Sequence, residues 1–156
     1  MKKIKILFVC LGNICRSPMA EFTMKDMVRG REAAFEIASA GTESYNIGRP
    51  VNPPAARELS RHGIGCAGFA ARQLRREDFQ HYDLLIGMDG ENIRDMERLG
   101  GRDGRKKIRR MMDFTDRPGD VDDPWYTGDY ATAWRDIEEG CRGLLAWLDS
   151  GTFAER

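Results

Sequence analysis

Short apolar runs alternate with longer segments of helical period along this chain. The runs at residues 4–10, 35–40 and 84–88 predict strands, and a weaker run at 107–111 predicts a fourth. Runs that are apolar at nearly every position are typical of strands buried on both faces. Such strands, alternating with helices, form a parallel sheet that helices cover on both faces. The pattern therefore predicts an α/β fold.

Local signals place helices between and after these strands. Ser17 is a candidate N-cap for a helix that has Pro18 at its first position. Further helices are expected at residues 52–63, 89–99 and 130–148. The helix at 89–99 should end at Gly100 and Gly101 because glycine is common just past a helix.

Length and charge limit the classes of protein to which the chain can belong. Its 156 residues favour one domain covering residues 1–156. Lys and Arg number 25, as do Asp and Glu, so no net field draws the chain to nucleic acid or to a membrane surface. The basic run at 102–110 lacks interleaved aromatic residues, and we interpret it as a solvated face.

The first residues and the cysteines bear on the cellular compartment. Three lysines among residues 2–5 lead into a short apolar run with no small-residue cleavage pattern behind it. We therefore expect no signal peptide, no membrane span and a cytoplasmic protein. We expect reduced thiols at all four cysteines, Cys10, Cys15, Cys66 and Cys141. The two histidines are in no cluster with metal-ligand spacing, so neither a metal nor a cofactor is expected.

The loop between Cys10 and Arg16 joins the first predicted strand to the first predicted helix. Ligands of open parallel sheets bind beyond the carboxyl ends of the strands, and a helix N-terminus there offers unpaired N–H groups to an anion. Gly12 and Asn13 tolerate left-handed backbone angles, so the loop can curl around one phosphoryl group. The expected phosphate-binding residues are Leu11, Gly12, Asn13, Ile14, Cys15 and Ser17.

Cys10 lies near the positive end of the predicted helix dipole and near Arg16, and both favour a thiolate over a thiol. The alternative is a small buried residue that closes a core strand. Arg16 offers a planar fork of donors that can hold two oxygens of an oxyanion, and the Ser17 hydroxyl can donate to the sulfur. The strand, the Gly-Asn pair and the Ser-Pro pair together favour a nucleophilic cysteine.

The stretch VCLGNICRSPMAE closely resembles the C-x5-R-[ST] signature of the low-molecular-weight protein tyrosine phosphatases. The resemblance covers nearly the whole chain, through the motifs SAGT (39–42), HGI (62–64), ARQL (71–74), EDF (77–79), MDGEN (88–92) and DDPWY (122–126). It implies a four-stranded parallel sheet in a flavodoxin-like three-layer fold. It also implies hydrolysis of phosphotyrosine in protein substrates through a phosphocysteine, with inorganic phosphate as a product.

This reaction needs a general acid, and the acidic run at 113–123 offers several carboxylates. Asp123 stands out because Pro124 restricts its backbone and two aromatic residues follow, although the residues alone leave other carboxylates of the run open. The resemblance implies that Asp123 is the acid and Ser39 a support of the loop. It also implies that the walls of a slot for a phenyl ring are Tyr45, Trp125 and Tyr126.

One departure from the family leaves a question open. The family usually carries a second histidine behind the loop, whereas this chain has Gly68 or Phe69 in that neighbourhood. The partner that helps Asn13, Ser17 and Ser39 hold the loop is therefore not identified.

Three alternatives to a tyrosine phosphatase remain at this point. An arsenate reductase on the same fold needs further cysteines, and Cys66 and Cys141 lie outside the segment where that family carries them. A protein arginine phosphatase carries threonine where this chain has Ile14. A non-catalytic phosphate-binding module is the third.

Overall fold

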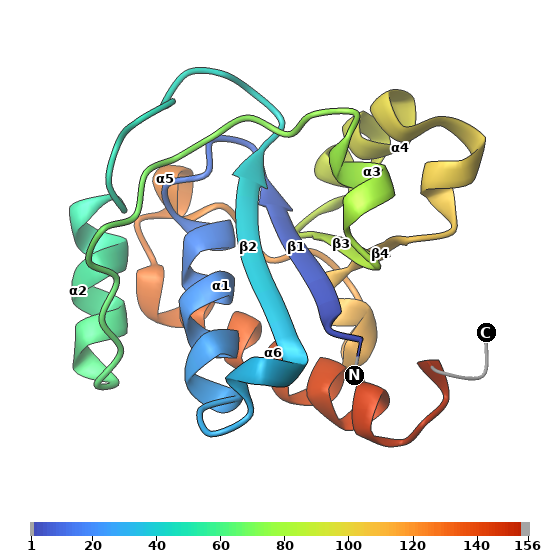
Figure 1. Cartoon of the computed structure of the whole chain (residues 1–156). Coiled ribbons are helices and arrows are strands. Elements are labelled where there is room, and N and C mark those ends of the chain that lie inside the picture. Colours follow the sequence, from blue (N-terminus) through green and yellow to red (C-terminus); the bar gives the residue numbers. More distant parts are fainter. Residues whose placement is uncertain (1, 154–156) are drawn as a thin grey trace.

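A four-stranded sheet forms the centre of the molecule in a computed structural model that describes residues 2–153. Its strands are β1 (Ile4–Cys10), β2 (Phe35–Gly41), β3 (Leu84–Gly87) and β4 (Ile108–Arg110). All neighbouring strands pair in parallel, in the order β2-β1-β3-β4 (Figure 1). The predicted α/β class and its four parallel strands are confirmed. The third and fourth strands are shorter than predicted, because Met88 lies beyond β3 and Met111 begins a 3-10 turn (Met111–Phe114).

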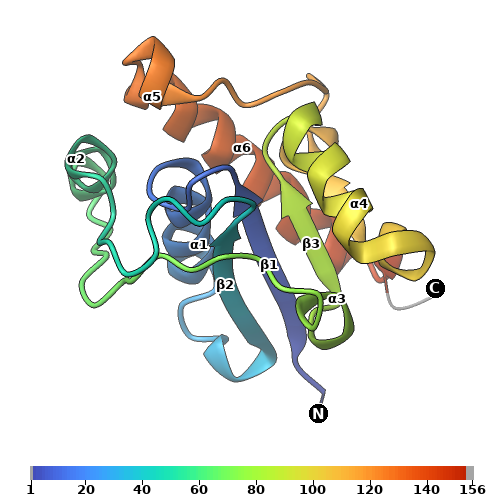
Figure 2. The ribbon, with the colours of Figure 1, turned by 90° about the horizontal axis from the view of Figure 1, so that it is seen from above.

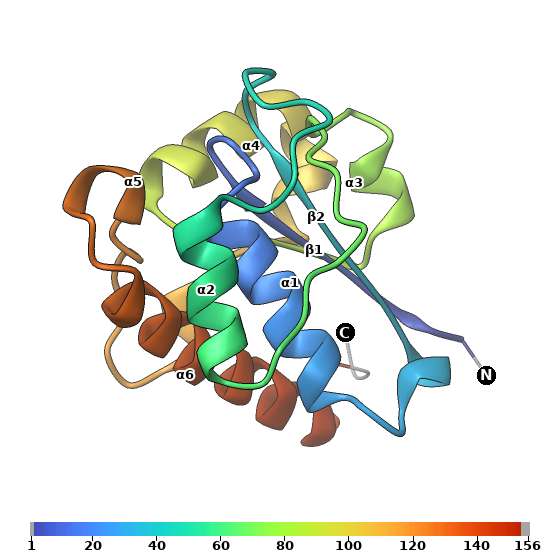
Figure 3. The ribbon, with the colours of Figure 1, turned by 90° about the vertical axis from the view of Figure 1, so that its left-hand side faces the viewer.

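Helices cover both faces of the sheet. Figure 2 shows α1 (Arg16–Met27) and α6 (Tyr130–Asp149) on one face, and α3 (Asp78–His81) with α4 (Gly90–Arg105) on the other. Helix α2 (Pro53–Arg61) packs outside against α1 and α6 (Figure 3). The short helix α5 (Pro124–Thr127) and a 3-10 turn (Glu32–Ala34) complete the elements. None of the helices in residues 2–153 is long and apolar enough to cross a membrane.

The two sides of β1 supply two separate apolar cores. Ile6 and Phe8 belong to the core beneath α1 and α6, whereas Leu7 and Val9 belong to the core beneath α3 and α4. All four side chains are fully buried. Alternate residues of a strand point to opposite faces, so a run without polar positions requires a cover on each side. This is why the apolar run of β1 predicted a central strand.

One predicted helix boundary is wrong, and a second is confirmed only as a kink. Helix α1 begins at Arg16 with Cys15 as the N-cap, and the Ser17 side chain lies 3.0 Å from the Cys10 sulfur instead of capping the helix. Helix α4 is broken by a kink at Gly101, whose φ of 68° and ψ of −163° are not helical, and a second helical stretch runs on to Arg105. The glycine pair therefore interrupts the helix as predicted, but does not end it. A Cβ on Gly100 would lie 2.6 Å from the Phe79 ring. That glycine therefore makes room for an aromatic side chain.

The carboxyl end of β1 is the point at which the strand order of the sheet reverses. The chain leaves β1 through α1 to reach β2 on one side, and β3 is the neighbour on the other side. Connections that diverge in this way leave a crevice at the strand ends. Gly41, paired with Cys10, lies under the loop, where a Cβ would approach the Leu11 carbonyl oxygen to 2.8 Å. The sheet therefore places the Cys10–Arg16 loop at an open edge.

Candidate active site

A cavity of about 410 Å³ opens above the loop between β1 and α1. Its floor consists of loop residues, and its sides come from the segments around residues 45 and 125. The lining residues are Cys10, Leu11, Gly12, Ile14, Cys15, Arg16, Tyr45, Asn46, Asp123, Trp125 and Tyr126. All the predicted site residues except Asn13 and Ser17 line this cavity. The side chains of those two contact each other behind the loop.

Cys10 is 3% exposed at the end of β1. Its sulfur accepts the backbone N–H of Asn13 at 3.3 Å and lies 3.0 Å from the Ser17 hydroxyl oxygen. Asn13 reaches this position in the left-handed region, with φ of 56°, which the sequence predicted for this residue type. Two polar groups therefore converge on the sulfur, an arrangement that stabilises negative charge there.

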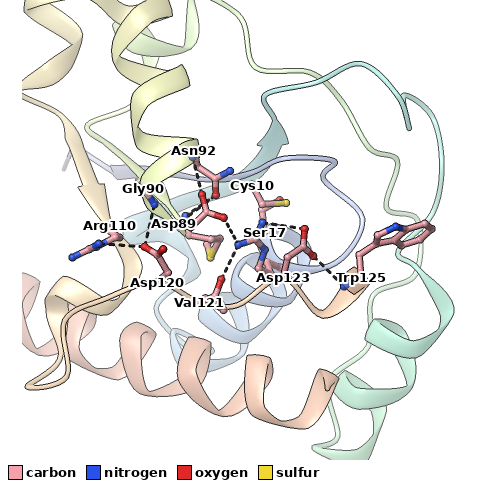
Figure 4. A network of polar contacts seen from close by, with 12 residues as sticks. Cys10, Ser17, Asp89, Gly90, Asn92, Arg110, Asp120, Val121, Asp123 and Trp125 are labelled. Carbon is pink, nitrogen blue, oxygen red and sulfur yellow. Dashed lines mark hydrogen bonds and ion pairs between the residues drawn. The ribbon is translucent and has the colours of Figure 1, made fainter. Parts of the chain in front are cut away.

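Arg16 is buried at the start of α1, and three acceptors surround its guanidinium. The acceptor residues Asp89, Val121 and Asp123 are labelled in Figure 4. Nη1 donates to a carboxylate oxygen of Asp89 and to the carbonyl oxygen of Val121, both at 2.7 Å. Nη2 lies 3.4 Å from a carboxylate oxygen of Asp123. Burial alone lowers the pKa of Arg16, but Cys10, Asp123 and Asp89 outweigh burial and raise it. The guanidinium is therefore a permanent cation at the cavity.

The role of Asp89 is not apparent from sequence reasoning. Asp89 is the N-cap of α4 and accepts the Asn92 N–H, while the Asn92 side chain accepts the N–H groups of Met88 and Asp89. An aspartate followed three residues later by asparagine at a strand end is a helix-start signal. Because β1 and β3 are parallel neighbours, this start lies at the same edge of the sheet as Cys10.

The segment before α5 is tied to this edge at two residues. The N–H of Val121 donates to the Met88 carbonyl at 2.9 Å. The Asp120 carboxylate accepts the Gly90 N–H at 3.0 Å and pairs with Arg110 at 3.2 Å, as Figure 4 shows. These contacts hold the chain two residues before Asp123.

Asp123 and the aromatic residues form the upper part of the cavity. Asp123 is the N-cap of α5 and accepts the Trp125 N–H at 3.1 Å. Tyr45, Trp125 and Tyr126 are 70%, 61% and 78% exposed, although large aromatic side chains usually bury much of their surface. They therefore present an apolar rim around a charged floor.

The loop is held from behind by the side chain of Asn13. Its Nδ2 donates to the hydroxyl oxygens of Ser17 at 2.8 Å and Ser39 at 3.0 Å, and its Oδ1 accepts the Arg72 N–H at 2.9 Å. The Ser39 hydroxyl donates to Glu21 at 2.6 Å. Glu21, on Ser39, and the Arg72 N–H, on Asn13, are thus the partners that the sequence left unidentified. The only sequence signal for Glu21 is a glutamate one helical turn after Ser17.

The other cysteines differ from Cys10 in their surroundings. Burial is the main reason that the pKa of Cys15 rises to about 11, and its sulfur contacts Tyr130 and Asn52. Burial also raises the pKa of Cys66 and of Cys141, which lies on α6. Cys15 is therefore a thiol at neutral pH. Within the described residues, no group of three or more His, Cys, Asp or Glu side chains is arranged to hold a metal ion.

Comparisons with known proteins all indicate one class, the small phosphotyrosine phosphatases. The family model for low molecular weight phosphotyrosine protein phosphatases matches residues 5–152. The low molecular weight protein-tyrosine-phosphatase YfkJ of Bacillus subtilis is 40% identical, over 92% of this chain and 94% of its own. The relative from Schizosaccharomyces pombe is 39% identical, over 81% of this chain and 84% of its own.

Solved structures give the same result. The crystal structure of YfkJ matches with a TM-score of 0.93 and 38% identity, covering 96% of this chain and 97% of that one. A protein tyrosine phosphatase from Entamoeba histolytica matches with a TM-score of 0.89 and 30% identity, covering 96% and 99%. The chain belongs to the low molecular weight phosphotyrosine protein phosphatase family.

Proposed function

We propose that this protein hydrolyses phosphotyrosine in protein substrates through a phosphocysteine on Cys10 and releases inorganic phosphate. The observation that carries the proposal is the convergence of the Asn13 N–H and the Ser17 hydroxyl on the Cys10 sulfur, below a cavity that Arg16 lines. Donors that converge on a sulfur in this way stabilise negative charge on it, and the thiolate is the nucleophilic form of cysteine.

In the first step the Cys10 thiolate attacks phosphorus in line with the leaving oxygen. An S–P bond forms, the bond from phosphorus to the phenolic oxygen breaks, and Asp123 gives its proton to that oxygen. Arg16 and the N–H groups of the loop hold the three equatorial oxygens. These donors are fixed before substrate arrives, so they stabilise the transition state without reorganisation.

In the second step the same carboxylate acts as a base. Asp123 takes a proton from a water molecule whose oxygen attacks phosphorus, and the S–P bond breaks to regenerate the thiolate. Asp123 suits both steps because it borders the cavity and is tied in place through Val121 and Trp125. Cys15 is not the nucleophile of this proposal, since its pKa of about 11 keeps it protonated.

The shape of the cavity supports phosphotyrosine as the phosphorylated residue. Cys10 is nearly inaccessible at the floor, so a short phosphoserine side chain would not bring its phosphorus to the sulfur. The exposed rings of Tyr45, Trp125 and Tyr126 border the cavity and suit the faces of a flat phenyl group. Ile14 adds apolar surface on the side of the loop.

The proposal extends to the chain as a whole. We regard residues 1–156 as one phosphatase domain acting in the cytoplasm, a compartment in which the four free cysteines would remain reduced.

The test is turnover of p-nitrophenyl phosphate and of a phosphotyrosine peptide by the wild type and by Cys10→Ser. The variant should lose turnover of both and still bind vanadate, and EDTA should not inhibit the wild type. Cys66→Ser is the matched control and should remain active, because Cys66 does not line the cavity. Turnover by Cys10→Ser would overturn the nucleophile assignment. An inactive wild type would favour the alternative of a non-catalytic phosphate-binding module.

A further inference from the structure

Glu21 is a buried carboxylate that the proposed chemistry does not use. It lies on α1 with 7% exposure, and it does not line the cavity above Cys10. One of its oxygens accepts the Ser39 hydroxyl at 2.6 Å, and the other pairs with Lys25 at 2.6 Å. A buried charge requires partners of this kind, so these two contacts explain how the structure accommodates Glu21 but not what Glu21 does. Its position at the end of a chain of hydrogen bonds to the nucleophile indicates what it does.

This chain consists of Glu21, Ser39, Asn13, Ser17 and the Cys10 sulfur, and is called here the rear hydrogen-bond chain. The amide of Asn13 is its branch point. A backbone N–H can only donate, so the Arg72 N–H requires the amide oxygen on its side. The NH₂ group then faces both serines and gives one proton to each.

Glu21 imposes the same orientation from the opposite end. An ionised carboxylate only accepts, so Ser39 must donate to Glu21 and accept from Asn13. If the Asn13 amide were flipped, its oxygen would face both hydroxyls and the Ser39 proton would be drawn away from the carboxylate. The buried charge would then lose a hydrogen bond, which is costly for a charged group that water does not reach.

The orientation of Asn13 decides where the Ser17 proton goes. With the amide as observed, the Ser17 oxygen already accepts a proton, and its own proton points to the Cys10 sulfur at 3.0 Å or to the Ala40 carbonyl at 3.5 Å. The shorter contact, to a charged sulfur, is favoured. With the amide flipped, the Ser17 proton would turn to the Asn13 oxygen and the thiolate would lose a donor.

We propose that Glu21 is a positioning residue for the nucleophile, which acts through Ser39 and Asn13 to keep the Ser17 hydroxyl donating to the Cys10 thiolate. The inference rests on the proposed function, in which Cys10 is the nucleophile. It predicts that removing Glu21 makes the Cys10 thiolate harder to form, which is the opposite of what loss of a nearby negative charge would do by itself. Through space, one anion disfavours another, so a Glu21 that acted only by its field would oppose the thiolate.

The experiment measures the rate of alkylation by iodoacetate against pH, which follows the thiolate directly and needs no turnover. Glu21→Ala should move the midpoint of this profile upward by about half a pH unit, a partial effect because the Arg72 N–H still orients the Asn13 amide. Glu21→Gln keeps an acceptor for Ser39 and should fall between the wild type and Glu21→Ala. If Glu21→Ala does not fold, the Gln variant carries the comparison.

Two further variants separate this role from a general effect on α1. Asp26→Ala removes a carboxylate of the same helix that pairs with Arg29 and does not touch the rear hydrogen-bond chain, so it should leave the midpoint unchanged. Ser39→Ala should raise the midpoint by itself, and adding Glu21→Ala to it should raise it no further. Coupling of this kind is expected of residues that act in one chain.

The inference is overturned if the midpoint of the alkylation profile is unchanged or lower in Glu21→Ala. It is also overturned if the shifts of Ser39→Ala and Glu21→Ala add in the double variant. A fall would show that the charge acts through space alone. Failure of the proposed function is a different result: Cys10 of the wild type would then be alkylated like an ordinary thiol, or Cys10→Ser would still turn over substrate.

Discussion

The guanidinium of Arg16 lies 3.4 Å from the carboxylate of Asp123. The group proposed to hold phosphate is therefore already paired with the group proposed to donate the proton. A bound phosphoryl dianion would take the donors of Arg16 and place negative charge beside Asp123. Like charges in one site favour the protonated acid, so substrate binding itself would prepare Asp123 to donate.

Asp123→Asn should slow poor leaving groups far more than good ones. Phenyl phosphate releases a basic phenolate that needs a proton, and its kcat should fall by about 10²–10⁴-fold, whereas p-nitrophenolate hardly needs one. The measurement is kcat for both substrates in both proteins. Asp122→Asn is the control, because Asp122 is the exposed neighbour outside the cavity. Equal slowing of the two substrates would indicate that another carboxylate is the acid.

Asp89→Asn should weaken the hold on phosphate without unfolding α4. Asparagine still caps the helix, but Arg16 loses a charged hydrogen bond of 2.7 Å and its fork is less firmly oriented. The loss of such a bond corresponds to a fall of about tenfold or more in kcat/KM, with a matching rise in the inhibition constant of inorganic phosphate. Asp95→Asn, which breaks an ion pair with Arg98 on the same helix, should change neither. Unchanged phosphate binding in Asp89→Asn would refute the role of Asp89.

Ile14→Thr should shift selectivity from phosphotyrosine toward phosphoarginine. Ile14 lines the cavity and is 8% exposed, and a threonine there would replace an apolar surface with a hydroxyl that can meet a guanidinium. We expect the wild type to prefer phosphotyrosine, and the ratio of the two kcat/KM values to fall by about tenfold in the variant. Ile47→Thr, at an exposed isoleucine that does not line the cavity, is the control. An unchanged ratio, or a wild type that prefers phosphoarginine, would contradict the selectivity argument.

Cys15 should protect Cys10 against irreversible oxidation. Peroxide converts the Cys10 thiolate to a sulfenic acid, and attack by the Cys15 sulfur forms a disulfide and releases water. Because Cys15 has a pKa of about 11, its thiolate fraction rises about tenfold per pH unit below that value, so disulfide formation should speed up with pH. The measurement is activity regained with dithiothreitol after peroxide treatment. Cys15→Ser should recover poorly and Cys66→Ser normally, whereas full recovery in both would exclude the disulfide.

Local patterns in the sequence were enough for the frame of the fold and the floor of the cavity. The apolar run of β1 requires a cover on both faces, and this fixes the sheet at the centre. Gly12 and Asn13 lie two and three residues after the end of that strand, and the left-handed angle of Asn13 is a property of its residue type. Cys10 and Arg16 are then the two ends of one short loop, so their proximity is a consequence of spacing alone.

Only the tertiary structure decided which groups surround these two residues. The partners of Arg16 stand 73 and 105 residues away, at Asp89 and Val121, and they meet it because parallel strands bring their carboxyl ends to one edge. Gly100 precedes the kink of α4, as its residue type predicted, but only the structure shows that it also makes room for Phe79, a side chain from a different helix. Glu21 reaches Ser39 across the packing of α1 on β2. Periodicity records which face of an element is buried, but not which side chain on another element will fill or bind it.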